Sequence, residues 1–432
     1  DLHSTSRRQR QMCIRDSNIN TYALGTYPAS DPRVQYDLNT AGPNNLGSLV
    51  YEGDKFGYDY KIEVMKGLLW TSYTAEMGRF QTMISAKLGQ TNMRRHGYMR
   101  NGMAANNSEG NSRIARFGEG GAKGSINFDA GKGHVFKIGV GYEWRPPMAN
   151  TAFISPEICN DYVLNLGDEH VFSSEFCYQY QNAWVHANVN AYYSRLDHVT
   201  EWQNFYNDDE NSFTYLSMTG IEKEYYGIEA GLDFKVASFL NFKAIGTISD
   251  AKNINNANVN YMLSKSAEVV KDYAYIKDMR ESGTPLTIGS LALDFHKSGW
   301  FVNLNANWYD RIYLSYSPSY RYKSSLKNRD MLFNDEPLPG SVDQAKGHGG
   351  WMVDGSIGKS IRLKHGSLNF NLMITNILNN RKIVSGGYEQ SRSDYTLNKE
   401  NEAKDRVYKF SKNPKKYYVF GTNGMFQVSY RF

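Results

Sequence analysis

The sequence predicts an all-β fold, an antiparallel sheet of about thirteen strands, and three observations support this prediction. The chain has 432 residues with 32 Tyr, 38 Gly and only 11 Pro, a balance that favours strands with tight turns over helices. Apolar and polar residues alternate along many segments, which is the period of a strand. Very short turns also alternate with long polar connections along the chain. This regular pattern indicates a series of hairpins.

Hydropathy and charge narrow the class of protein further. No run of about eighteen apolar residues occurs, so the sequence predicts no transmembrane helix. The mean hydropathy of -0.59 does not exclude a transmembrane β-barrel, because only every second residue of its strands faces lipid. The net charge of +5 is small and its basic residues are scattered, so nucleic acid is not an expected partner.

Three cysteines are too few for a disulfide scaffold. Cys159 and Cys177 could form one disulfide in an oxidising envelope, but Cys177 reads as a strand residue. Two free thiols are therefore the favoured alternative. Cys13 belongs to the segment discussed next.

Residues 1–17 (DLHSTSRRQRQMCIRDS) share no periodicity with the rest of the chain. They resemble the in-frame translation of a transposon-type sequencing adapter, most closely from Met12 to Asp16 and into Ser17. A natural targeting segment would need an apolar stretch that these residues lack. We therefore expect residues 1–17 to be non-native, residues 18–432 to be a partial barrel domain, and the gene to be truncated before Asn18.

The clearest hairpin surrounds the turn at 364–367 (KHGS). Polar residues before and after this turn share one face of each strand, and apolar residues share the other. Lys359 is the exception on the apolar face. The apolar set before the turn is Trp351, Val353, Ile357, Ile361 and Leu363, and the set after it is Leu368, Phe370, Leu372 and Ile374.

A second hairpin around 297–299 (KSG) carries two tryptophans on one apolar face. Trp300 and Trp308 are eight residues apart, about 26 Å along a strand and about 20 Å in height at a tilt near 40°. This separation is typical of the two aromatic girdles of a membrane barrel. Further short turns are expected at 76–79, 131–134, 181–182 and 236–239.

Long connections are expected near 92–119, 147–168, 198–222, 253–283, 317–347 and 378–415. Soluble sandwiches have no reason to place every long connection at one end, whereas outer-membrane barrels have short periplasmic turns and long extracellular loops. The first strand is expected from Tyr58 to Tyr73 and the last ends at Phe432. An odd number of strands predicts an incomplete barrel with unpaired edges.

The chain ends on an aromatic residue within an alternating pattern. Phe426, Val428, Tyr430 and Phe432 share one face, which Tyr418 and Phe420 are expected to extend. This pattern resembles the C-terminal signal of outer-membrane barrels, which the barrel-assembly machinery reads. The four residues are therefore predicted to act as that signal.

Further motifs resemble those of TonB-dependent receptors. The stretch 368–380 (LNFNLMITNILNN) resembles the segment before the last loop in that family, with Asn376-Ile377-Leu378-Asn379 carrying Leu in place of the usual Phe. Arg145-Pro146-Pro147 with Asn150, Ala152 and Phe153, and the ending KNPKKYYVFGTNGMFQVSYRF, resemble the large Bacteroidetes receptors that carry a carboxypeptidase-regulatory-like domain before the plug. The resemblance implies a 22-stranded barrel, of which this chain holds about the last thirteen strands.

Sites for catalysis or metals are not predicted, and no cofactor is expected. Ser356 and Lys359 satisfy a Ser-x-x-Lys pattern, but they project to opposite faces of a strand. The histidines have no metal-ligand spacing. Asp208, Asp209, Glu210 and Asn211 have oxygen ligands suited to calcium, but a solvated acidic loop is the favoured interpretation.

Loop aromatics are the candidate ligand-binding residues, because such side chains stack on sugars or planar groups while offering polar tips. Loop packing or a place in the girdle is the open alternative. The predicted set is Trp202, Tyr206, Tyr313, Tyr316, Tyr320, Arg321 and Tyr322, with Phe205 and Tyr309 beside them.

The function implied by these observations is nutrient uptake across the cell outer membrane, without enzymatic activity. By resemblance, the partners are the inner-membrane TonB complex acting through the missing plug, the barrel-assembly machinery and the lipid bilayer. A surface lipoprotein lid is left open. A passive porin-like channel and an outer-membrane hydrolase are the alternatives, and siderophore, oligosaccharide, peptide and cobalamin are all open as ligands.

Overall fold

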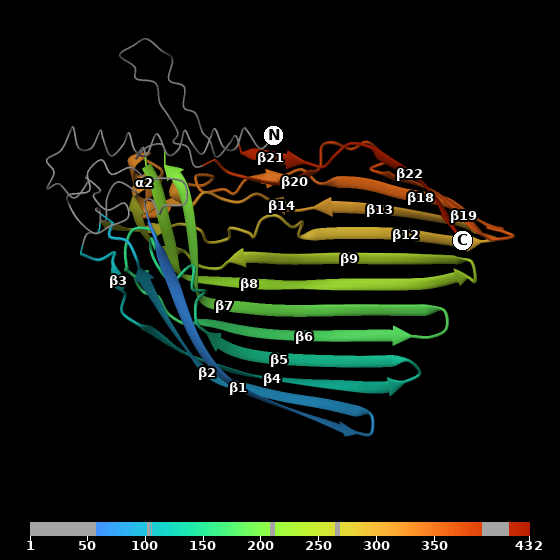
Figure 1. The fold of residues 1–432 in the computed structure, drawn as a ribbon, viewed down its shortest axis with the longest axis horizontal. Coiled ribbons are helices and arrows are strands. Elements are labelled where there is room, and N and C mark those ends of the chain that lie inside the picture. The colour runs from blue at the N-terminus through green and yellow to red at the C-terminus, as the bar shows by residue number, and fades with distance from the viewer. Residues whose placement is uncertain (1–57, 102–103, 105, 208–211, 264–267, 391–413) are drawn as a thin grey trace, which may run out of the picture.

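The computed structural model describes residues 58–101, 104, 106–207, 212–263, 268–390 and 414–432. The expected residues 1–17 and the candidate calcium loop at 208–211 lie outside this part of the chain. The main feature is an antiparallel sheet whose principal path joins thirteen strands, as predicted (Figure 1). They are β1 Tyr60–Met77, β2 Phe80–Gly97, β4 Ala115–Gly131, β5 His134–Arg145, β6 Glu169–Gln181, β7 Val185–Asn207, β8 Ser212–Ala237, β9 Leu240–Asn253, β12 Thr287–Lys297, β13 Trp300–Asp310, β18 Gly350–Leu363, β19 Gly366–Thr375 and β22 Asn423–Arg431.

Shorter elements belong to the connections between these strands. β3, β10 and β11 attach to the main sheet and bring it to 16 strands, while the other short strands pair in three separate two-stranded sheets. The bounds are β3 Gly110–Asn111, β10 Ala257–Leu263, β11 Val269–Ala274, β14 Ile312–Tyr313, β15 Leu332–Phe333, β16 Glu336–Pro337, β17 Lys346–Gly347, β20 Val384–Tyr388, β21 Lys415–Tyr418, the 3₁₀ helix η2 Pro318–Arg321 and the helix α2 Lys323–Asn328.

Short and long connections gather at opposite ends of the sheet, which we call the turn end and the loop end (Figure 1). All six predicted short turns are confirmed, since each joins two consecutive paired strands. Between β12 and β13, Ser298 and Gly299 have φ of 52° and 79°. Two positive φ values in a two-residue turn match the right-handed twist of the flanking strands. The turn therefore fixes the register of the hairpin.

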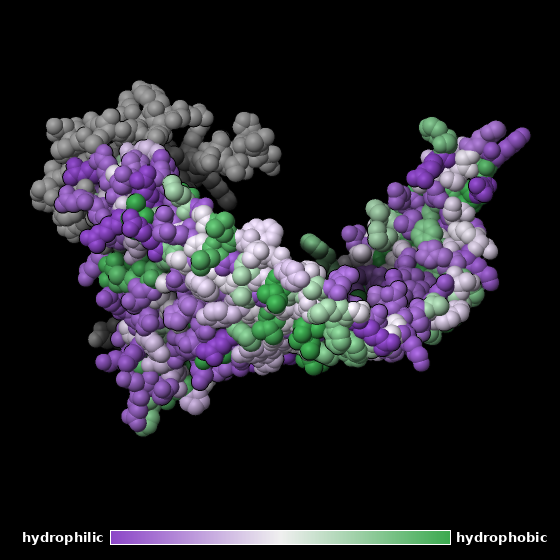
Figure 2. Space-filling view, turned by 90° about the horizontal axis from the view of Figure 1, so that it is seen from below, coloured by the Kyte–Doolittle hydropathy of each residue, from purple (hydrophilic) through white to green (hydrophobic). Residues whose placement is uncertain are grey.

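The register places apolar residues on one face of the sheet, here called the apolar face, and polar residues on the other, the polar face. Ile228, Ile248 and Thr287 face one another across three strands, and Asn303 pairs with Asp294 and Ser356 on the opposite face. Because side chains alternate along a strand, this register sorts the main strands from β2 to β22 in the same way. The edge strand β1 departs from it, since Leu68 and Trp70 lie on the polar face beside Lys66 and Lys87. Figure 2 shows pale and green residues gathered across the middle of the molecule, with a polar loop end beside them.

Aromatic residues mark both limits of the apolar face. Trp300 lies beside the turn end, while Trp308 and Trp351 lie opposite each other near the loop end with ring centroids 6.5 Å apart. Lys359, the exception noted in the sequence, is also on this face. Its Nζ donates to the Ser298 carbonyl at 2.8 Å and lies 4.8 Å from the Trp300 ring centroid. The ammonium thus reaches the turn end and leaves only its apolar stem on the face.

The two outer strands of the principal path, β1 and β22, do not pair with each other, so the sheet is open. Leu69 and Tyr73 on the edge strand β1 are 82% and 71% exposed on the apolar face. Within the described part of the chain, the outer edge of β1 therefore has a row of backbone donors and acceptors without strand partners. The unpaired edges expected from the odd strand count are therefore present.

Two details differ from the sequence prediction. The segment 198–222, expected as a loop, is mostly strand, because β7 and β8 continue beyond the sheet and pair up to Asn207 and Ser212, with register shifts between Leu196 and Glu201. Alternation signals fail across such bulges, since the faces exchange there. The last strand also begins at Asn423, later than expected, and Tyr418 lies in β21, which pairs with β20.

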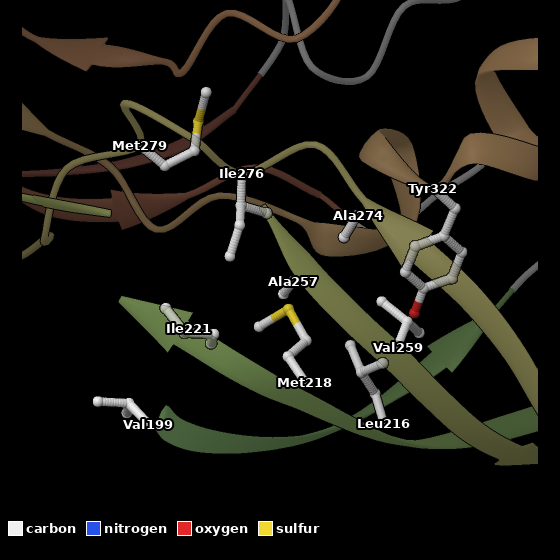
Figure 3. Packing of buried hydrophobic residues seen from close by; sticks show 10 residues of the cluster. All are labelled: Val199, Leu216, Met218, Ile221, Ala257, Val259, Ala274, Ile276, Met279 and Tyr322. Atoms are coloured by element: carbon white, nitrogen blue, oxygen red, sulfur yellow. The ribbon is translucent and has the colours of Figure 1, made fainter. Parts of the chain in front are cut away.

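The extension of β8 is packed on both sides, which explains its stability outside the main sheet. Leu216 and Met218, both fully buried, join a cluster with residues of β10, β11 and Tyr322 (Figure 3). Tyr215 and Met262 join a second cluster with the connection that follows β5. The loop end is therefore a folded layer with its own apolar cores. Such burial provides the main favourable free energy for a connecting region.

Candidate functional site

The aromatic residues predicted to bind ligand lie in the loop-end layer. Tyr313 belongs to β14, Tyr316 follows it, and Tyr320 and Arg321 belong to η2. Tyr313, Tyr320 and Tyr322 are each at most 8% exposed, and Arg321 is only 1% exposed. Most of this predicted set is therefore covered by other loop residues, and the ligand-binding role stays a prediction.

Packing contacts account for several of these side chains. Tyr322 stacks on Tyr261 with ring centroids 5.7 Å apart and an interplanar angle of 9°. Trp202 donates its indole N–H to the Ile154 carbonyl at 3.1 Å. Tyr206 differs because it is 41% exposed. Burial also raises the pKa of Tyr322 well above its usual range, so its hydroxyl stays neutral.

Tyr316 lines a small polar pocket of about 110 Å³ at the loop end. The pocket brings together charged residues from β7, β8 and the connection between β11 and β12, which were not predicted from the sequence. Glu201, Lys223 and Glu281 lie far apart in the sequence, so no spacing signal marked them. The lining residues are Glu201, Gln203, Lys223, Asn253, Met279, Arg280, Glu281, Ser282, Ser315 and Tyr316.

Lys223 is the electrostatic centre of this polar pocket. Its side chain is 8% exposed and its Nζ donates to Glu201 and, at 2.6 Å, to Glu281. Burial alone would lower the pKa of Lys223, but the two carboxylates outweigh it and raise the pKa above its ordinary value. The ammonium is therefore charged, and two carboxylates surround one cation.

Tyr316 joins this arrangement through its hydroxyl group. Asn253 Nδ2 donates to the Tyr316 hydroxyl at 3.2 Å, and the Arg321 guanidinium lies 5.5 Å from the centroid of its ring. Burial, followed by the charge of Glu201, raises the pKa of Tyr316, so the phenol stays protonated. A protonated phenol and a carboxylate pair give the pocket both hydrogen-bond donors and acceptors.

The polar face continues from the loop end toward the turn end as a wall of paired polar residues. Lys66 is 2.6 Å from Glu119, and Lys87 is 2.6 Å from Glu143. Lys243 on β9 lies 3.0 Å from Asp294 on β12, farther along the sheet. A wall of this kind favours water and polar solutes on one side of the sheet.

The connection after β5, residues 146–168, folds against the polar face. Ala152 and Phe153 are fully buried and pack with Met93 and Phe117. Arg95 anchors the connection, since its Nε donates to the Pro156 carbonyl at 2.7 Å and its Nη1 to the Asn160 side chain at 2.6 Å. The residues around 150–153 that resemble a family motif thus fix a loop against the wall.

The Asn376-Ile377-Leu378-Asn379 stretch is a structural turn after β19. Asn376 has φ of 49°, and its Nδ2 donates to the carbonyls of Asn380 at 3.0 Å and Phe420 at 2.8 Å. Asparagine tolerates this left-handed conformation better than most residues. The motif therefore holds the chain that leads into the last strand.

The Ser-x-x-Lys pattern does not form a catalytic pair in the structure. Ser356 and Lys359 lie on opposite faces, and the Ser356 hydroxyl donates to Asn303 Oδ1 at 3.3 Å. Among the described residues, no group of three His, Cys, Asp or Glu side chains could hold a metal ion. In the same part of the chain, no helix has the length and apolar character needed to cross a membrane.

Both cysteines of the described region are free thiols, as favoured by the sequence analysis. Cys159 is buried in the connection after β5, while Cys177 lies on β6. Burial raises the pKa of Cys159 to about 11. A buried neutral thiol of this kind is unreactive.

Comparison with solved structures identifies the architecture. The chain is similar to the copper transporter OprC, with a TM-score of 0.56 and 10% identity over 88% of this chain and 50% of that chain. It is also similar to the ferric citrate transporter FecA, with a TM-score of 0.53 and 11% identity over 89% and 47% of the two chains. A third similar structure is the ferric-catecholate import receptor Fiu from K12 E. coli, with a TM-score of 0.53 and 10% identity over 91% and 47%.

Sequence comparison gives no relative, since no family model and no curated protein matches the chain. Identities near one in ten establish the fold alone. The chain spans about half the length of the transporters that it resembles. The predicted fold class is confirmed: the chain is an all-β antiparallel sheet with the architecture of outer-membrane β-barrel transporters, with short turns at one end and long loops at the other.

Proposed function

We propose that this chain is part of an outer-membrane receptor that takes up a scarce nutrient, without enzymatic activity. The observation that carries the proposal is the continuous sorting of the main strands from β2 to β22 into an apolar face and a polar face. A sheet of this design separates lipid from an aqueous interior. Similarity to three transporters supports the same reading at the level of fold.

The direction of transport follows from the two ends of the sheet. We place the loop end outside the cell and the turn end in the periplasm, as in barrels with long extracellular loops. A ligand would meet the loop-end layer first and then pass along the polar face, where Lys66, Glu119, Lys87 and Glu143 present paired charges. In this proposal the cell outer membrane surrounds the apolar face.

The remaining partners are also part of the proposal. A plug and about nine further strands would precede Asn18 and close the open sheet between β1 and β22. The TonB complex would act through that plug, and the barrel-assembly machinery would read Phe426, Val428, Tyr430 and Phe432. A surface lipoprotein lid stays an open alternative.

Ligand contact is proposed for the loop-end layer. Tyr206 is exposed there, and Tyr316 reaches the polar pocket beside Lys223 and Glu281. The other predicted residues, Trp202, Tyr313, Tyr320, Arg321 and Tyr322, would support these contacts from the packed layer. The names of the similar transporters refer to copper, ferric citrate and ferric catecholates. Similarity of fold does not specify a ligand, so siderophore, oligosaccharide and peptide are all proposed as ligand classes for this chain.

The first experiment is to read the source DNA upstream of Asn18. A signal peptide, a plug domain and about nine more strands are the expected result, together with DNA that does not encode residues 1–17. A genomic origin of residues 1–17, or a signal peptide close to Asn18, would contradict the receptor and favour a passive channel.

The second experiment tests transport with the recovered full-length protein. Uptake of a labelled ligand should require the TonB complex and should stop when a protonophore removes its energy source. A passive porin-like channel would instead conduct ions in a planar bilayer without any energy source. Conductance without TonB would therefore replace the receptor by the alternative.

A further inference from the structure

The apolar face carries a hollow of about 780 Å³ near the loop end. Its lining is almost entirely apolar and comes from β7, β8, β9, β12 and β13. The floor is formed by Ala230, Gly246 and Gly289, which lie side by side at one level of the sheet. Trp308 pairs with Gly289 and stands at the side of the hollow.

Two glycines in register cause this hollow. Gly246 and Gly289 pair directly on neighbouring strands, and a Cβ placed on either one would meet no atom within 4 Å. The adjacent rows carry Ile228 and Ile248 on the loop side, which are 58% and 66% exposed. The isoleucine side chains thus project from the apolar face beside the glycines, and the space above the two glycines is empty.

An occupant is required if this face lies in a bilayer. Water has no polar partners in an apolar hollow, and an empty space forfeits the dispersion contacts of its lining. The hollow is continuous with the apolar face, so the chains of neighbouring lipids meet it directly. Its position next to Trp308 and Tyr226 is the level at which aromatic residues mark the edge of the hydrocarbon layer.

Polar groups border the loop side of the hollow. Two residues beyond Ile248, Asp250 accepts from Arg280 at 2.9 Å and lies 3.2 Å from Arg311, so two guanidinium groups share one carboxylate. Asp310, next to Arg311, is exposed and faces the same side. This charged border lies where the headgroup of a lipid would follow its acyl chain.

We propose that the hollow is a binding site for one acyl chain of a membrane lipid, which the protein retains in preference to the surrounding lipid. This inference rests on the proposed membrane placement of the apolar face. The glycines provide the space, the isoleucines and Trp308 provide the side walls, and the charged border limits the depth of the chain.

Gly289→Leu tests the site because the new side chain fills the hollow without meeting an atom near its Cβ. Gly124→Leu is the matched control. Gly124 lies on the same face of β4 between Ile84 and Val140, outside the hollow, and its Cβ would meet only the Met83 carbonyl at 3.7 Å. Both variants replace a strand glycine by leucine on the apolar face.

The measurement is native mass spectrometry of the full 432-residue chain after detergent purification and addition of phosphatidylglycerol. We expect wild type and Gly124→Leu each to retain one more phospholipid per chain than Gly289→Leu. Equal retention by all three proteins, or no retained lipid on the wild type, would overturn the site. Circular dichroism of each sample reports whether the sheet is formed.

A second measurement separates this site from membrane placement itself. In vesicles that contain phosphatidylglycerol with brominated chains, quenching of Trp300 and Trp351 tests whether the apolar face meets lipid at all. Comparison with Trp308→Phe isolates the fluorescence of Trp308. We expect Trp308 to be quenched at a several-fold lower fraction of brominated lipid than Trp300 and Trp351. Gly289→Leu should remove this difference. Uniform quenching of all three would leave the membrane placement intact and overturn the retained chain.

Discussion

Arg321 and Glu389 form an ion pair that is enclosed in the loop-end layer, with side chains only 1% and 0% exposed. The contact is bidentate, with Nη1 at 2.6 Å from Oε2 and Nη2 at 3.0 Å from Oε1. Glu389 also accepts from the backbone N–H groups of Ser317 and Ala345. One carboxylate therefore joins η2, the segment before β17 and the end of β20.

Removal of one partner should loosen this layer strongly. We expect Arg321→Ala to lower the local stability of the layer by about 3–5 kcal/mol, because it leaves a buried carboxylate without its cation. Hydrogen exchange of residues 312–347 measures the effect, and the exchange of β18 and β19 should not change.

The exposed ion pair between Lys323 and Asp335 is the matched control. Its side chains are 42% and 74% exposed and its atoms are 3.0 Å apart. Lys323→Ala should cost far less stability than Arg321→Ala, since water solvates both groups in either state. Equal effects of Arg321→Ala and Lys323→Ala would contradict the role of burial.

The main sheet was predictable because its signal is local and repeats. Alternation around the turn at 364–367 and the two-residue turn at 298–299 define faces and register without distant information. The β7 and β8 extension was not predictable in this way. Its register shifts beyond Leu196 exchange the faces, and its burial depends on β10 and on the connection after β5.

The candidate site shows the same division. Aromatic composition led to Tyr316, but Glu201 and Glu281 are 22 and 58 residues away from Lys223 in the chain, so their grouping depends on the tertiary fold. The burial of Arg321 was not visible either, because its partner Glu389 lies 68 residues away in the chain. Such pairings follow from the tertiary fold and leave no spacing signal.

Asn376 should be critical for the approach to the last strand. Asn376→Ala removes two hydrogen bonds from buried Nδ2 and places a residue with a Cβ but no polar group at positive φ. We expect a loss of about 1–3 kcal/mol in denaturant unfolding. Asn376→Gly keeps the backbone conformation and removes only the hydrogen bonds, so it should lose less than Asn376→Ala. A smaller loss for alanine would contradict this account.

Lys223 should hold the polar pocket together. Lys223→Met leaves Glu201 and Glu281 beside each other without their cation, and we expect a local loss of about 3–5 kcal/mol. The added variants Glu201→Gln and Glu281→Gln should restore most of this loss, because they remove the repulsion. The measurement is hydrogen exchange of the paired extensions of β7, from Val199 to Asn207, and of β8, from Ser212 to Ile221. If the glutamine variants do not restore protection, charge repulsion is not the cause.

Cys159 should make stability depend on pH in the alkaline range. Its pKa is raised from 9.0 to about 11, so the folded state favours the neutral thiol. The stabilising contribution is fully present below pH 9 and is lost as pH rises through about 11. The stability difference between wild type and Cys159→Ala, measured by denaturant unfolding at pH 8 and pH 11, should therefore shrink at the higher pH.

Maleimide should label Cys177 and spare Cys159 at pH 7.

Phe432 offers a test that separates assembly from stability. Its side chain is 99% exposed, and its nearest aromatic neighbour is Tyr430 at 6.1 Å between centroids. Because Phe432 contributes little packing, Phe432→Ala should leave denaturant unfolding within about 0.5 kcal/mol of wild type. If the terminal aromatic is read during barrel assembly, the same variant of the recovered full-length protein should be depleted from the outer membrane several-fold.

Phe370→Ala is the contrasting change. Phe370 pairs with Val428 and Lys359 inside the sheet, so this substitution should lower stability directly. Normal membrane levels of Phe432→Ala would remove the assembly signal from the proposal and leave the final strand as a purely structural element.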